Sequence, residues 1–246
     1  MLKMVAVLST LALMSACATH PKTTASRPAA IKRIAIIPAS NPRLYSFENA
    51  APPIGGYPFQ YWVNKVDSKS KAKIFNDRLN SQPAHLGDKL TEEVAIALRS
   101  HGFTVEVLQG LPRPANDPDN VDYDKISSDA DAILHVWISE VGLYSSGFSL
   151  DYIPRVNAAG KLFIQGQDDN IYDEDIYYGV DARKGKEWAI APDAKYAYRS
   201  FDLVMSNIDE LRSAYATGVL EISKRMSEQI FNAAAKFTAD GHTQTQ

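Results

Sequence analysis

Histidines, acids and serines are the side chains of this sequence that could catalyse a reaction or hold a metal. The chain has five histidines, which are His20, His85, His101, His135 and His242. No two of them have the helical spacing of a zinc site, and the single cysteine has no second cysteine to complete one. Only His135 lies in a run that resembles a buried strand, where we expect a hydrogen-bonded structural residue. The pattern therefore predicts no metal centre.

Five acids gather in a short stretch of the chain: Asp168, Asp169, Asp173, Glu174 and Asp175. A helix–loop–helix calcium site needs acids at alternate positions, a central glycine and a distal glutamate, and this run lacks that glycine. Strand alternation would place Asp173 and Asp175 on one face and Glu174 on the other. We expect a solvated hairpin edge that its charges protect from aggregation. A glycan hydrolase would instead need two such acids to meet across a cleft.

The serines and glycines do not form a catalytic motif. The segment Tyr144–Phe148 lacks the Gly-x-Ser-x-Gly elbow of a serine hydrolase, and the pair Gly55–Gly56 is not followed by the Lys-Ser/Thr of a phosphate loop. We expect a protein that is not an enzyme and that uses no cofactor or metal.

Cys17 is the only cysteine, and it follows a basic start, an apolar run over Val5–Met14 and two small residues. These features are typical of a secretory signal, which is too short to span a bilayer stably. The stretch Leu13–Cys17 resembles the lipobox of bacterial lipoproteins, although Met14 stands where leucine is usual. The resemblance implies a signal peptide over residues 1–16 and lipid on Cys17, which becomes the first mature residue. The alternative is an ordinary secretory peptide with a chance cysteine.

Residues 17–30 are rich in Thr, Ala, Pro and Ser and predict a flexible, lipidated tether. Ala18 follows the cysteine, whereas an aspartate there would resemble an inner-membrane retention signal. In a Gram-negative host this favours anchoring in the outer membrane, with the domain facing the periplasm. The net charge is −3, and losing Lys3 with the signal would make it −4, which argues against nucleic acid as a partner. A single domain is expected over residues 31–237, followed by a polar tail over 238–246.

Apolar periodicity predicts the elements of this domain. Strands are expected at 33–38, 103–108, 132–144, 155–165 and 171–180, with turn residues at 166–170 joining the last two as a hairpin. Helices are expected at 86–101, ended by Gly102, and at 209–237, where one apolar stripe contains Leu211, Tyr215, Val219, Ile222, Met226 and Ile230. The predicted fold class is α/β (α+β), a mixed sheet of about five strands with two long helices packed on it.

Three segments of this pattern, Lys32–Pro38, Leu86–Leu108 and Asp129–Gly142, resemble an α/β domain shared by several periplasmic lipoproteins. These are the curli secretion lipoprotein, the lipoprotein activators of penicillin-binding proteins, and the amino-terminal domain of the Tol-system propeller protein. The shared features are a strand ending in proline, a helix closing on His-Gly-Phe, and the entry Asp-Ala-Asp-Ala-Ile-Leu into a long strand. The resemblance implies a binding or assembly role.

One segment departs from that family pattern. Those domains usually have a short loop between the first strand and the first long helix, whereas this chain has an excursion of about 46 residues, Ala39–Ala84. Its first half is aromatic, and its second half predicts a short helix over 68–79 with Ile74, Phe75 and Leu79 turned inward. Three interpretations of the excursion are open. It is a loop that buries its own rings against the domain, a surface that binds a partner or faces the membrane, or a disordered segment. The residues assigned to the candidate partner-binding surface are Tyr57, Phe59, Tyr61 and Trp62, because clustered aromatic rings are typical anchors of interfaces.

Two functions follow from the sequence. The first is a membrane-anchored envelope lipoprotein that acts as a non-enzymatic adaptor or assembly factor and binds another envelope protein or itself. The alternative is a cell-wall or glycan hydrolase whose carboxylate site no motif reveals.

Overall fold

The computed structural model describes residues 30–49, 58–145, 151–179 and 188–243, with the side chains of 49, 58–67 and 241–243 outside that description. Its sheet has the strand order β3-β1-β4-β5-β6-β7, and β2 lies beside β4. The strands are β1 (Arg33–Ile37), β2 (Ser46–Asn49), β3 (Thr104–Val107), β4 (Ala132–Ser145), β5 (Tyr152–Phe163), β6 (Asn170–Gly179) and β7 (Ala189–Ile190). The α/β class is confirmed, with seven strands in place of about five.

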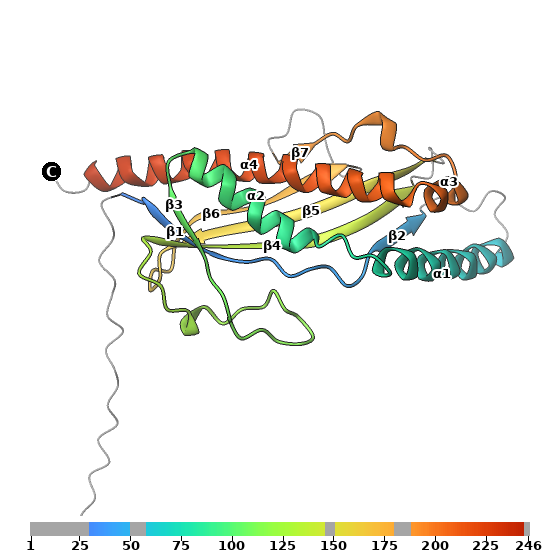
Figure 1. The fold of residues 1–246 in the computed structure, drawn as a ribbon, viewed down its shortest axis with the longest axis horizontal. Coiled ribbons are helices and arrows are strands. Elements are labelled where there is room, and N and C mark those ends of the chain that lie inside the picture. The colour runs from blue at the N-terminus through green and yellow to red at the C-terminus, as the bar shows by residue number, and fades with distance from the viewer. Residues whose placement is uncertain (1–29, 50–57, 146–150, 180–187, 244–246) are drawn as a thin grey trace, which may run out of the picture.

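The helices are α1 (Pro58–Asn80), α2 (Leu86–Ser100), α3 (Phe201–Ser206) and α4 (Ile208–Thr243). Helices α2 and α4 lie side by side on one face of the sheet (Figure 1). The six residues of the predicted stripe on α4 are all fully buried there. Burying a stripe of this kind is the main source of helix stability in a folded domain. The two long helices predicted from the sequence are therefore confirmed.

Gly218 of α4 packs against the ring of Tyr178 on β6. A Cβ atom at this position would lie 2.7 Å from Tyr178 Cδ1, which is closer than such atoms approach one another. The glycine costs the helix about 1 kcal/mol relative to alanine, but it lets the helix axis approach the sheet closely.

The excursion Ala39–Ala84 is not structureless, because it contains β2 and the long helix α1. Asn76 joins them: its side chain accepts from the Tyr45 backbone N–H at 2.7 Å and donates to the Tyr45 carbonyl at 2.8 Å. Phe75 and Leu79 of α1 are buried as predicted, whereas Ile74 is 51 % exposed and was placed wrongly. Each helical residue turns about 100°, so Ile74 points away from the face that Phe75 and Leu79 share.

Rings from the first half of the excursion join the core. Tyr45 is buried and stacks on Tyr215 of α4 with ring centroids 6.0 Å apart. Phe47 stacks on Tyr152 of β5 at 5.4 Å. Tyr45 and Phe47 therefore agree with the interpretation that the excursion buries its own aromatic rings.

The opposite face of the sheet carries a smaller core under the segment 108–131, which includes the 3₁₀ helix η1 (Tyr123–Lys125). Five buried residues form this core: Ile37, Val121, Ile126, Ile133 and Phe163. The segment lies across the sheet on the side away from α4 (Figure 1).

Helix α4 continues to Thr243, beyond the helix end predicted at residue 237. The Thr238 hydroxyl donates to the Ala234 carbonyl at 3.0 Å within the helix, and no proline interrupts the backbone hydrogen bonds. Within the described ranges, no helix is both long and apolar enough to cross a membrane.

Candidate functional site

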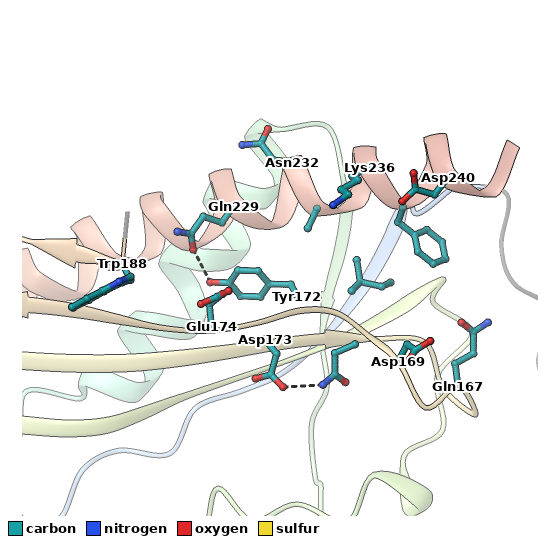
Figure 2. Close-up of a pocket in the computed structure, with 14 residues that line it drawn as sticks. Gln167, Asp169, Tyr172, Asp173, Glu174, Trp188, Gln229, Asn232, Lys236 and Asp240 are labelled. Atoms are coloured by element: carbon teal, nitrogen blue, oxygen red, sulfur yellow. Dashed lines mark hydrogen bonds between the residues drawn. The ribbon is translucent and has the colours of Figure 1, made fainter. Parts of the chain in front are cut away.

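A groove of about 690 Å³ lies between the outer side of β6 and the C-terminal part of α4 (Figure 2). A volume of this size is typical of sites that hold a ligand or several side chains of a partner. The β5–β6 hairpin lies at one end of the groove, and Trp188, the residue before β7, lies at the other.

One wall of the groove is a face of α4. Its six residues are Gln229, Asn232, Ala233, Lys236, Phe237 and Asp240. Each of them lies three or four positions from another member of the set, which places all of them on one side of a helix. This face lies next to the apolar stripe of Ile222, Met226 and Ile230. The helical periodicity of these six residues is the signal in the sequence that could have revealed this second stripe.

The other wall is an edge of the sheet that β7 covers only in part. β7 pairs only with Tyr177 and Tyr178 of β6. The Tyr177 backbone N–H donates to the Trp188 carbonyl at 2.8 Å and therefore points away from β5. In an antiparallel pair the backbone groups of every second residue point the same way, so those of Asp173 and Asp175 also point outward. In the described chain no strand lies beside these two residues.

The acids Asp173, Glu174 and Asp175 of β6 lie on the faces of the sheet that strand alternation predicted. The register pairs Asp173 with Lys161 and Asp175 with Ala159, so their side chains project on the face away from α4. Glu174 projects toward α4 together with Tyr172 (Figure 2). The hairpin predicted from the sequence is confirmed, and three acids of the cluster, Asp169, Asp173 and Glu174, line the groove.

Negative charge dominates the groove. Four of its lining residues are acids, Asp169, Asp173, Glu174 and Asp240, and they face a single basic residue, Lys236. Desolvation and the neighbouring charge of Asp173 raise the pKa of Asp175 above its ordinary value. Asp175 lies beside the groove rather than in its lining, and Lys161 is the cross-strand neighbour of Asp173. The excess of carboxylates over basic side chains in the lining favours a cationic ligand.

Tyr172 fixes the junction between the two walls. Its hydroxyl donates to Gln229 Oε1 at 2.9 Å, which ties β6 to α4. Burial and the nearby charges of Glu174, Asp175 and Asp173 raise the pKa of Tyr172 well above its ordinary value, so the phenol stays neutral and the hydrogen bond persists. This hydrogen bond therefore joins the two walls of the groove.

The four lining carboxylates are spread along the groove rather than turned toward one another (Figure 2). Asp173 accepts a hydrogen bond from Asn170 Nδ2 at 2.8 Å, Asp169 lies on the hairpin, and Asp240 lies on the helix. In the described ranges no three His, Cys, Asp or Glu side chains are close enough to hold a metal ion.

A second polar cluster lies on the far face of the sheet. Ser40 donates to Asp119 Oδ2 at 2.6 Å, and Arg113 Nη1 lies 3.4 Å from Asp119 Oδ1. His135 is 2 % exposed, and its Nδ1 is 2.9 Å from the Tyr123 hydroxyl. The serine bonds to the aspartate directly and not to the histidine, so the cluster does not have the order of a catalytic triad. His135 is the hydrogen-bonded strand residue that was predicted.

His135 should make the protein sensitive to acid. Burial, which outweighs the opposing charge of Asp119, lowers the pKa of His135 to about 4 from 6.5. Between these values the unfolded chain binds a proton that the folded chain does not, so stability is lost as the pH falls from 6.5 toward 4. The full difference corresponds to about 3 kcal/mol.

Chemical denaturation at pH 7 and pH 4 measures this loss. Wild type should lose about 3 kcal/mol more than His135→Gln, which keeps a polar partner for Tyr123 but does not titrate. The control is His85→Asn, at an exposed position with a φ of 49° that asparagine tolerates, and it should follow wild type. Equal losses in wild type and His135→Gln would contradict this assignment.

The residues that the sequence singled out for function lie mostly outside the described part of the chain. Cys17 and Tyr57 are outside it, and Phe59, Tyr61 and Trp62 belong to α1 at positions whose side chains are not described. The aromatic surface and the lipidation site therefore stay predictions. The groove between β6 and α4 is a further candidate site, formed by segments that lie far apart in the sequence.

No family model matches the chain, and no curated protein matches it. Among solved structures, protein XCC0632 from Xanthomonas campestris is similar with a TM-score of 0.40 and 10 % identity over 87 % of this chain and 89 % of that chain. The hypothetical protein CT253 from Chlamydia trachomatis has a TM-score of 0.35 and 12 % identity over 82 % and 98 %. Lipoprotein GNA1162 from Neisseria meningitidis has a TM-score of 0.28 and 13 % identity over 74 % and 98 %.

The resemblance to the three groups of periplasmic lipoproteins stays a prediction.

Proposed function

We propose that the chain is a lipoprotein held on an envelope membrane, the outer membrane in a Gram-negative host, by lipid on Cys17. Its folded domain is a non-enzymatic adaptor that binds another envelope protein. The observation that carries the adaptor role is the groove between β6 and α4, where backbone groups of the sheet edge lie beside apolar and charged side chains. Such an edge is a ready-made site for protein binding.

The arrangement of the acids favours binding over the alternative of glycan hydrolysis. Hydrolysis needs two carboxylates at a fixed separation on either side of the bond that breaks. The carboxylates of this groove are spread along it, and Asp173 is held by Asn170. The distribution instead supports attraction of a positively charged partner over an extended surface.

The position of the groove suits a partner close to the membrane. The described chain begins, and α4 ends, toward the same end of the long axis of the molecule (Figure 1). The tether would leave from that end, and its thirteen residues after Cys17 span roughly 20 Å if flexible. The predicted aromatic surface of Tyr57, Phe59, Tyr61 and Trp62 would add a second contact to a partner or to the lipid headgroups.

A crosslinked pull-down of the full-length lipoprotein from envelopes tests the adaptor role. Wild type should recover a discrete envelope protein. Ala233→Trp, which places a large ring in the groove, should reduce that recovery at least tenfold, whereas Ala235→Trp on the exposed surface of the same helix should not. Recovery of no envelope protein, or equal loss in both variants, would contradict the proposal.

A further inference from the structure

Among the residues that the structure describes, none forms a strand beside Asp173 and Asp175 on the outer edge of β6. Asp173 and Asp175 direct their backbone N–H and C=O groups outward, and β7 begins only opposite Tyr177. The groove lies along the part of β6 between the β5–β6 hairpin and Trp188. About five residues of an extended segment, at about 3.3 Å each, would fit along this part of β6.

The two sides of the edge differ in chemistry. Side chains of an added strand would alternate between the two faces of the sheet. On the face away from α4 they would meet the carboxylates of Asp173 and Asp175. On the face toward α4 they would meet the Tyr172 and Phe237 rings and the methyl group of Ala233.

We propose that the groove binds an extended segment of a partner protein in which basic and apolar residues alternate, and that this segment pairs with β6 as an additional strand. This inference rests on the proposed adaptor function and specifies its ligand. Backbone hydrogen bonds to β6 provide affinity, and the alternating surroundings provide specificity, as in other cases of strand addition. Basic side chains opposite Asp173 and Asp175 also relieve the repulsion between these acids.

The same acids disfavour a second copy of this chain as the occupant. Two β6 edges placed together would bring Asp173 and Asp175 of one copy against the same acids of the other. Like charges directly opposite one another destabilise a strand pair. The acids on the β6 edge therefore disfavour pairing with a second β6 edge and favour pairing with a basic strand.

Fluorescence anisotropy with synthetic peptides and the full-length lipoprotein in detergent micelles tests the inference. The probe is a labelled Lys-Val-Lys-Val-Lys-Val peptide with blocked ends, and the comparison peptide is Glu-Val-Glu-Val-Glu-Val. The basic peptide should bind at least tenfold more tightly. The double variant Asp173→Lys/Asp175→Lys should weaken its binding at least tenfold. The control Asp117→Lys/Asp124→Lys, which makes the same change in charge at exposed positions outside the groove, should change binding less than threefold.

Methylation of the peptide backbone separates strand pairing from simple charge attraction. Every second amide of an added strand faces β6, so methylating the amides of either the lysines or the valines should reduce affinity at least tenfold, and methylating the other set should not. If the added strand is antiparallel to β6, methylation of the lysine amides should weaken binding. If it is parallel to β6, methylation of the valine amides should weaken binding. Two methylated peptides that both bind like the parent would overturn the inference, as would an acidic peptide that binds equally well.

The inference and the proposed function fail separately. Peptides that do not discriminate, together with a pull-down that depends on Ala233, would overturn strand addition and leave the adaptor role standing. A pull-down that recovers no envelope protein would remove the adaptor role itself, whatever the peptides do.

Discussion

Cys17→Ser is expected to move nearly all of the protein from the membrane fraction to the soluble fraction and to abolish its labelling by fatty acid. Lipid is attached to the thiol, which serine lacks, and each buried methylene of an acyl chain contributes about 0.8 kcal/mol to membrane binding. In the part of the chain that the structure describes, no helix is long and apolar enough to cross a membrane. Fractionation and labelling of the intact chain measure both effects.

The matched control is Thr19→Ser, two residues after the cysteine, which should leave labelling and membrane association unchanged. Fatty-acid labelling that persists in Cys17→Ser would contradict lipidation at this residue.

Gly179→Ala is expected to cost the domain about 4 kcal/mol or more and to prevent folding if the total stability is modest. Gly179 ends β6 with a φ of 99°, and a Cβ atom there would lie 1.9 Å from the Pro154 carbonyl oxygen on β5. The variant would suffer both backbone strain and a collision between the two strands. Because β6 forms one wall of the groove, the site would be lost with the strand pairing.

Gly102→Ala separates strain from collision. Gly102 follows α2 with a φ of 91°, and no atom lies within 4 Å of the position a Cβ would occupy. Its substitution should cost only the strain of a left-handed backbone, about 1–2 kcal/mol. Urea unfolding of the two variants measures the difference. Equal destabilisation would show that the close approach of β5 and β6 is not what restricts Gly179.

The elements with strong local periodicity could be predicted from the sequence. The stripe of Leu211, Tyr215 and Ile222 on α4 and the β5–β6 hairpin each repeat at the period of their element. The split of Asp173 and Glu174 between the two faces of β6 followed from the same alternation. These predictions needed no knowledge of distant contacts.

The excursion could not be predicted because distant contacts hold it. β2 is a strand of four residues that pairs with the second half of β4, and Asn76 of α1 binds the Tyr45 backbone. β7 has two residues and depends on the hydrogen bond from Tyr177 to Trp188. Segments this short have no periodicity to detect.

Only one part of the candidate site, the acidic hairpin, could be predicted from the sequence. The acids were recognised as an exposed edge, but the groove forms only when α4 packs beside β6. Phe237 and Asp240 lie more than sixty residues from Asp173 along the chain. Sequence spacing alone could not bring them together, although their helical spacing marked a common face.

Photocrosslinking in intact envelopes tests the central claim, that a tethered domain receives a partner in this groove, most directly. A photoreactive amino acid replaces Asn232, which lines the groove, or Ala235, which is exposed but does not line it. We expect one discrete product with another envelope protein from position 232 and little or none from 235. Products of equal yield from the two positions, or no product from position 232, would contradict the account.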